Sequence, residues 1–262
     1  MEIDLKGKRS LVCGSSQGIG FAIAQSLAEC GSEVVLMARN EERLKSAKNE
    51  LNSDQGQSQE ILVADFSDSN QVEKVINDYL SENEGFDVLI NNTGGPAGGE
   101  LIDSNIQQLR KAFEQHILCS QILTQYCVKS MKSNGYGRII NIVSTSVKIP
   151  IPGLGVSNTI RGAMANWSKT LSLELAEYGI TINNILPGFV KTARLDSIIN
   201  SKSEKSAQPK EQVQQNMINS VPAKRFGEPI ELGYLAAFLA SPFAAYINGV
   251  NIPVDGGRTG SL

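Results

Sequence analysis

Residues 13–20 read Cys13-Gly14-Ser15-Ser16-Gln17-Gly18-Ile19-Gly20, a glycine-rich turn between an apolar run, Ser10–Cys13, and a helical pattern, Ile19–Glu29. A second apolar run, Glu33–Met37, follows. Glycine allows a tight turn and leaves no side chain between the backbone and a ligand. A helix that begins in such a turn directs unpaired N–H groups and the positive end of its dipole at that ligand. The context predicts a phosphate or diphosphate site, although the glycine spacing alone would also fit an ordinary turn.

Apolar runs of strand length alternate with helical patterns along the chain. The predicted strands are Ser10–Cys13, Glu33–Met37, Glu60–Val63, Val88–Ile90, Arg138–Val143, Thr181–Leu186 and Val250–Pro253. The predicted helices are Ile19–Glu29, Asn40–Asn52, Ser69–Asn83, Ile106–Lys132, Ser157–Tyr178 and Ile230–Ala240. This order predicts a parallel sheet with helices on both faces. We therefore expect one α/β domain over residues 1–262, a doubly wound parallel sheet (Rossmann fold) with ligands at the carboxyl ends of its strands.

Composition excludes several classes of function. The 262 residues are 41% apolar and carry a net charge of −3, which suits one large domain and gives no basic stripe for nucleic acid. No apolar stretch is long enough for a membrane span, and residues 1–8 lack a signal-peptide core. The single histidine and four scattered cysteines (Cys13, Cys30, Cys119 and Cys127) give no metal-binding pattern. We expect no metal, buried free thiols and a cytoplasmic protein.

One segment, residues 196–225, is polar and has no strand or helix prediction. It follows the predicted strand Thr181–Leu186 and so lies at the ligand edge of the sheet. Long polar inserts in compact domains are usually lids or disordered loops. We expect a substrate lid, with disorder as the alternative.

Several motifs in order resemble the short-chain dehydrogenase/reductase family, in the branch that contains the 3-oxoacyl-carrier-protein reductases. They are Gly14-x3-Gly18-x-Gly20, Asn91-Asn92-Thr93-Gly94, the run 137–144 ending in Ser144, Leu186-Pro187-Gly188, and Asn248-Gly249 with Val254-Asp255-Gly256-Gly257. The resemblance covers essentially the whole chain. It implies a nicotinamide cofactor, a small-molecule substrate and a homotetramer assembled through the two long helices.

The resemblance also implies which residues contact the cofactor. They are Gly14, Ser16, Gln17, Gly18, Ile19, Gly20, Arg39, Asp65, Asn91, Thr93, Gly94, Pro187, Gly188, Val190 and Thr192. After the second strand, enzymes that use NAD place a carboxylate that would repel a 2′-phosphate. Here that position holds Ala38 followed by Arg39, whose guanidinium matches a phosphate. NADP is therefore favoured over NAD, unless Arg39 only pairs with Glu41 or Glu42.

The chain departs from the family at the catalytic positions. Family members use a serine, a tyrosine, a lysine four residues later and an asparagine on the preceding helix. Ser144 fits the serine, but the alignment places Ser157, Arg161 and His116 at the other three positions. Arginine stays protonated and cannot relay protons, whereas histidine titrates near neutrality. One hypothesis is that His116 and Arg161 replace the missing acid, and the other is that they only pack and hydrogen-bond.

Three functions remain open from the sequence. The first is an NADP-dependent oxidoreductase that interconverts a carbonyl and an alcohol with remodelled proton transfer. The second is a dehydration or epimerisation on the same scaffold, and the third is a non-catalytic nucleotide sensor or inactive subunit. Lys148, four residues after Ser144, together with Arg161 would suit a carboxylate or phosphate on the substrate, unless Lys148 is merely solvated. The sequence names neither the substrate nor the direction of the reaction.

Overall fold

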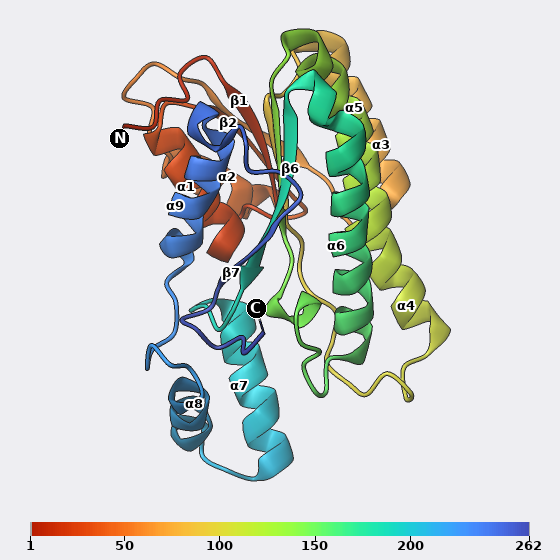
Figure 1. The fold of residues 1–262 in the computed structure, drawn as a ribbon, viewed down its shortest axis with the longest axis vertical. Coiled ribbons are helices and arrows are strands. Elements are labelled where there is room, and N and C mark those ends of the chain that lie inside the picture. The colour runs from red at the N-terminus through yellow and green to blue at the C-terminus, as the bar shows by residue number, and fades with distance from the viewer. Residues whose placement is uncertain (1, 262) are drawn as a thin grey trace.

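The computed structural model describes residues 2–261 as one sheet between two layers of helices (Figure 1). The described strands are β1 (Arg9–Cys13), β2 (Glu33–Ala38), β3 (Gln59–Val63), β4 (Val88–Asn91), β5 (Gly137–Ile142), β6 (Ile180–Pro187) and β7 (Asn251–Val254). Every neighbouring pair is parallel, in the order β3-β2-β1-β4-β5-β6-β7. The strand order reverses between β1 and β4, which is where ligands bind in sheets of this kind. The predicted doubly wound sheet is confirmed.

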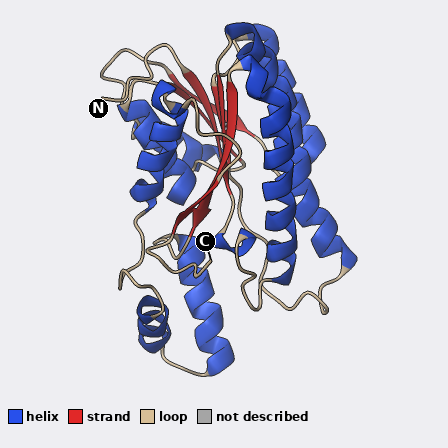
Figure 2. Cartoon of the chain, in the orientation of Figure 1, coloured by secondary structure: helices blue, strands red, loops and turns tan. Residues whose placement is uncertain are grey.

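The helices cover both faces of this sheet (Figure 2). They are α1 (Gly18–Glu29), α2 (Glu41–Asn49), α3 (Ser69–Glu82), α4 (Ile106–Phe113), α5 (Cys119–Asn134), α6 (Gly155–Leu175), α7 (Ala193–Ser206), α8 (Lys210–Asn219) and α9 (Pro229–Ala240). Helices α1, α2 and α9 pack one core layer against the sheet, and α3 and α5 pack the other. Both faces of the strands are therefore dry, which explains their continuous Val, Ile and Leu content.

The predicted helix Ile106–Lys132 is interrupted. Its middle turn, Glu114–Leu118, is a π-helix between α4 and α5. A π turn inserts an extra residue into the helical repeat and is common at functional sites. His116 lies at the centre of this turn and is buried, at 4% exposure.

The polar segment 196–225 folds into helices that the sequence did not predict. It contains most of α7 and all of α8, which pack around a small core of their own. That core consists of Leu195, Ile199, Val213, Met217 and Phe226. The two helices extend beyond the sheet at the end opposite the N-terminus (Figure 1). The segment is thus ordered helix at the ligand edge, and its role as a lid stays a prediction.

Four asparagines form a hydrogen-bonded row across the buried sheet. Asn91, Asn141, Asn184 and Asn251 occupy paired positions on β4, β5, β6 and β7. Their side-chain amides bond from strand to strand at 2.8, 3.0 and 2.8 Å. Ser168 of α6 completes the network by contacts of 2.8 and 2.7 Å to the second and third members. Buried amides of this kind are tolerated because each one finds partners.

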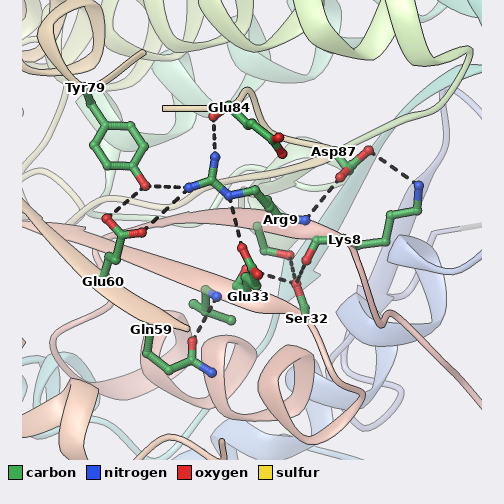
Figure 3. A network of polar contacts seen from close by, with 11 residues as sticks. Lys8, Arg9, Ser32, Glu33, Gln59, Glu60, Tyr79, Glu84 and Asp87 are labelled. Atoms are coloured by element: carbon green, nitrogen blue, oxygen red, sulfur yellow. Dashed lines mark hydrogen bonds and ion pairs between the residues drawn. The ribbon is translucent and has the colours of Figure 1, made fainter. Parts of the chain in front are cut away.

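A second polar cluster closes the opposite edge of the sheet, at the amino ends of β1 to β3 (Figure 3). Arg9 donates to Glu33 at 3.2 Å, to the Tyr79 hydroxyl at 2.8 Å and to the Glu84 carbonyl. The Tyr79 hydroxyl in turn donates to Glu60 at 3.1 Å. Burial is the main cause that raises the pKa of Tyr79 to about 12, so the phenol stays protonated. This cluster ties three strands together far from the ligand edge.

Candidate active site

The glycine turn follows β1 and leads into α1, as predicted. Gly14 has a φ of +57°, and a Cβ there would lie 2.5 Å from the Asn92 carbonyl oxygen. A Cβ on Gly20 would lie 2.3 Å from the Gly14 carbonyl oxygen, so only glycine fits at either position. Gln17, the residue before α1, makes no side-chain cap. The first-turn N–H groups of α1 are therefore left for a ligand anion.

A serine that the sequence reasoning missed holds this turn in place. Ser15 is fully buried, donates to the Val12 carbonyl at 2.7 Å and accepts from the Met37 N–H at 3.0 Å. It therefore links the turn to both β1 and β2. The available signal was a serine within the glycine-rich turn, since a short hydroxyl side chain readily bonds to nearby backbone groups.

Two arginines lie exposed near the carboxyl end of β2. Arg39 follows the strand. The pKa of Asp65 is lowered chiefly by a hydrogen bond from the Ser67 backbone N–H, and to a smaller extent by the charge of Arg39. Arg43 of α2 donates to the Gln17 side chain at 3.1 Å, which joins α2 to the glycine turn. In the described chain Glu41 and Glu42 form their ion pairs with Lys45 rather than with Arg39. Asp68, and not Asp65, caps α3.

His116 and Thr93 meet at the carboxyl end of β4. The Thr93 hydroxyl oxygen lies 2.7 Å from His116 Nδ1, while the buried Nε2 has no partner in the described structure. Burial, followed by the nearby charge of Arg161, lowers the pKa of His116 well below its usual value. The imidazole is therefore neutral at neutral pH, which corrects the expectation of a histidine that titrates near neutrality.

Arg161 of α6 is buried beside this histidine, at 8% exposure. Its Nη1 donates to the Ile142 carbonyl at 2.9 Å, and its Nε has no partner within residues 2–261. Burial lowers its pKa to about 10, with a smaller effect from Arg194, so the group stays charged at neutral pH. Both residues line a cavity of about 10 Å³, enough for about one water molecule. Its lining is Asn91, Asn92, Thr93, His116, Ser120, Ile142, Arg161 and Met164.

The remaining predicted catalytic residues lie on elements adjoining this cavity. Ser144 lies two residues after the end of β5, is half-buried and accepts from the Ser146 N–H at 3.1 Å. Ser157 lies in the first turn of α6, one turn before Arg161. Lys148 ends the short 3₁₀ turn after Ser144 and is half-buried, so it is not a freely solvated side chain.

The loop after β6 completes the site. Pro187 ends that strand, and a Cβ on Gly188 would lie 2.6 Å from Asp255, which fixes the turn. Val190 is buried. Thr192 caps α7 through a contact of 3.4 Å to the Leu195 N–H, and its methyl carbon lies 3.4 Å from where a Cβ of Gly18 would be. The start of α7 thus lies against the glycine turn.

Arg194, the second residue of α7, also points into this region and was missed from the sequence. It donates to the Pro96 carbonyl at 2.7 Å, across 98 residues of chain. Ser16, Ile19 and Gly94 lie at the same edge, on the glycine turn and the loop after β4. The structure therefore brings the predicted residues to one rim of the sheet, with Arg43 and Arg194 added.

Comparison with known proteins supports the whole-chain resemblance. The sequence model of the family described as enoyl-(acyl carrier protein) reductase matches residues 14–259. An NADPH-dependent reductase of Bacillus subtilis strain 168, BacG, is 33% identical over 97% of this chain and 99% of its own. The 3-oxoacyl-[acyl-carrier-protein] reductase of Rickettsia prowazekii is 33% identical over 97% and 98%. L-sorbose reductase of Gluconobacter frateurii, solved with NADPH and L-sorbose, superposes with a TM-score of 0.93 at 28% identity, covering all of both chains.

Proposed function

The chain belongs to the short-chain dehydrogenase/reductase family, and from this premise we propose that it is an NADP-dependent oxidoreductase that interconverts a carbonyl and an alcohol. The observation that carries the proposal is one juxtaposition at the sheet rim. The uncapped start of α1 lies there together with Ser144 and the His116–Arg161 pair. The uncapped helix start suits the phosphates of a dinucleotide, and Ser144 with the His116–Arg161 pair suits a reacting carbonyl.

The residues present fit a nicotinamide dinucleotide with a 2′-phosphate. The glycine turn supplies unpaired N–H groups for the diphosphate, and Arg39 and Arg43 supply charge where the 2′-phosphate of NADPH would lie. No carboxylate occupies the end of β2 or the position after it, since these hold Ala38 and Arg39. Asp65, Asn91, Thr93, Gly94 and the loop from Pro187 to Thr192 would line the rest of the cofactor. BacG and L-sorbose reductase, which are described with NADPH, support this assignment.

Bound NADPH would supply the hydride, and the protein would supply orientation and charge. The Ser144 oxygen accepts a backbone N–H, so its own hydrogen is free to bond the carbonyl oxygen of a substrate. The Ser157 hydroxyl, at the start of α6, would add a second polar contact. Arg161 remains charged and would stabilise the developing alkoxide or hold ribose hydroxyls.

Proton delivery would involve His116 as a neutral group. Its Nδ1 is held by Thr93, its buried Nε2 has no partner among the described residues, and the residue lines the cavity that Arg161 also lines. We infer that a water molecule in this cavity connects the substrate oxygen to solvent, with the imidazole orienting it. The imidazole would thus act as a hydrogen-bond relay instead of an imidazolium acid, because its pKa is lowered.

The experiment that tests the function follows NADPH absorbance with a panel of ketones, aldehydes and alcohols, after calorimetry with NADPH and NADH. Tight NADPH binding with turnover on any member supports the proposal. Lack of affinity for either coenzyme, oxidised or reduced, would reject it.

A nucleotide sensor or inactive subunit is the second candidate. It is favoured by one observation, which is that neither Arg161 nor the neutral His116 can readily release a proton at neutral pH. NADPH binding without turnover on the whole panel would support it. Turnover without net change in the cofactor would instead favour the dehydratase or epimerase alternative.

We also propose a cytoplasmic homotetramer. Exposed apolar side chains of the helical layer, Phe113, Leu118 and Leu173, would be covered by a second copy. The four unpaired cysteines fit a reducing compartment, and no helix among residues 2–261 is long and apolar enough to span a membrane. Light scattering coupled to size exclusion tests the assembly, and a monomer would contradict it.

A further inference from the structure

Two arginine side chains from different helices converge on the loop after β4. If Gly95 carried a Cβ, that atom would lie 3.7 Å from Arg194 Nη2 and 3.8 Å from Arg161 Nη2. Arg194 belongs to α7 and Arg161 to α6, so the two guanidinium groups reach this point from separate elements. Glycine at position 95 leaves the space between them open.

The two positive charges have no counter-charge in the described structure. Across residues 2–261, neither arginine forms an ion pair with a carboxylate, and their hydrogen bonds go to the Ile142 and Pro96 carbonyls. Arg161 is more than nine-tenths buried, and its Nε has no partner. Buried charges in proteins are normally paired, because an unpaired one loses its hydration without compensation.

The positive charges of Arg161 and Arg194 also repel each other across the open space beside Gly95. This repulsion adds to the cost of removing Arg161 from water. The charge of Arg194 is one of the causes that lower the pKa of Arg161, which shows that the two groups interact. An anion bound between them would relieve both effects. A carboxylate is the best match, because its two oxygens fit the planar fork of a guanidinium.

We propose that Arg161 and Arg194 bind a carboxylate of the substrate beside Gly95, so that the substrate is an oxo acid or the corresponding hydroxy acid. This inference rests on the proposed function, since it places the carboxylate near the carbonyl that Ser144 would hold. It assigns Arg194 as a specificity residue on α7, the helix that Thr192 caps, so substrate binding would also fix the position of this helix.

The first test compares benzoate with its neutral counterpart benzamide, and with phenylphosphonate, as calorimetric ligands for the protein saturated with NADP. We expect benzoate to bind at least 10-fold more tightly than benzamide. Arg194→Gln should remove that preference, whereas Lys205→Gln, which removes the same charge from the last turn of α7, should keep it. Equal affinities for benzoate and benzamide would overturn the proposal, and much tighter binding of phenylphosphonate would overturn the choice of a carboxylate.

A second test places the counter-charge within the chain. Gly95→Asp would bring a carboxylate between the two guanidinium groups, at a residue without a positive φ. We expect a higher melting temperature and loss of benzoate binding, with Gly95→Asn as the uncharged control. A lower melting temperature for Gly95→Asp than for Gly95→Asn would contradict an unfilled anion site. The proposed function is tested separately, because reduction of a neutral ketone with NADPH could succeed while both of these tests fail.

Discussion

The Thr93 hydroxyl oxygen and His116 Nδ1 lie 2.7 Å apart, although 23 residues of chain separate them. This contact joins the loop after β4 to the π turn between α4 and α5. It holds Nδ1 of an imidazole ring that lines the cavity beside Arg161, while the buried Nε2 has no partner among the described residues. The only histidine of the chain is therefore held in one orientation at the candidate active site.

Stability should depend on the titration of this histidine. The pKa of His116 is lowered in the folded protein, so the unfolded chain binds a proton at a higher pH than the folded one. Stability from the neutral ring should be fully present above the unfolded value, about 6.5, and be lost as the pH falls below it. Denaturant unfolding from pH 7.5 to 5 measures this loss, and His116→Asn should show a smaller decrease. Parallel curves for the two proteins would contradict the buried neutral ring.

Turnover should depend on His116 if its imidazole orients the water molecule that transfers the proton. His116→Ala should lower kcat by about 100-fold, the lower end of what positioned proton-transfer groups contribute. NADPH affinity should be unchanged, because the cofactor phosphates would lie at the glycine turn. Thr93→Val is the companion variant, and it should lower kcat less, because the imidazole is still present although its Nδ1 contact is lost. An unchanged rate in His116→Ala would exclude a role in proton transfer.

Coenzyme preference should depend on Arg39 and Arg43. Arg39→Ala should weaken NADPH binding about 10- to 100-fold and leave NADH binding nearly unchanged, because only NADPH carries the 2′-phosphate. Arg43→Ala should weaken NADPH binding less, because its guanidinium is already engaged with the Gln17 side chain. Fluorescence titration with both coenzymes measures the ratio, with Lys45→Ala as an exposed control on α2. Equal wild-type affinities for NADPH and NADH would exclude the role of Arg39.

Restoring the usual family residues should raise ketone reduction. Ser157→Tyr with Arg161→Lys would place a phenol and an ammonium one helical turn apart at the start of α6. We expect faster NADPH oxidation with simple neutral ketones, since the phenol would supply the acid. The single variant Ser157→Tyr serves as control, because Arg161 keeps its contact with Ile142. No gain in the double variant would show that the pocket and not the acid limits the rate.

The polar cluster around Arg9, at the amino ends of β1 to β3, should contribute to the stability of the fold and not to coenzyme binding. Arg9→Ala would remove the donor to Glu33 and to the Tyr79 hydroxyl oxygen, and should destabilise the protein by about 1–3 kcal/mol. Coenzyme affinity should stay the same, because the residues drawn in Figure 3 include the first residues of β1 and β2 and lie at the amino ends of the strands. Urea unfolding and NADPH titration of the same sample test both statements. A loss of NADPH affinity would show that the two edges are coupled.

The sequence predicted the sheet well, because each strand is a short apolar run bounded by turn residues. The seven predicted strands agree with the structure to within a few residues. The residues predicted to contact the cofactor also lie along one rim of the sheet, because the carboxyl ends of parallel strands share one edge. Roles for Ser144, Ser157, Arg161 and Lys148 stay predictions.

The missed features depend on packing that periodicity does not record. Helices α7 and α8 were missed because their residues are mostly polar, although Leu195 and Ile199 are spaced one turn apart and gave a weak signal. The π turn around His116 has no marker in the residue pattern. Arg194 was missed because its partner, Pro96, lies 98 residues away. The low pKa of His116 likewise follows from burial, which a lone histidine in a sequence does not reveal.

The row of asparagines has a consequence for how the strands find their alignment during folding. Strands made only of Val, Ile and Leu would pack almost equally well if one slid past its neighbour, because both faces are apolar. A slide of one residue anywhere between β4 and β7 would separate Asn91, Asn141, Asn184 or Asn251 from its neighbour and leave buried amides without partners. Each orphaned group costs about 1–3 kcal/mol. The row therefore discriminates against shifted sheets, and it does so next to the cavity where the candidate catalytic groups must meet.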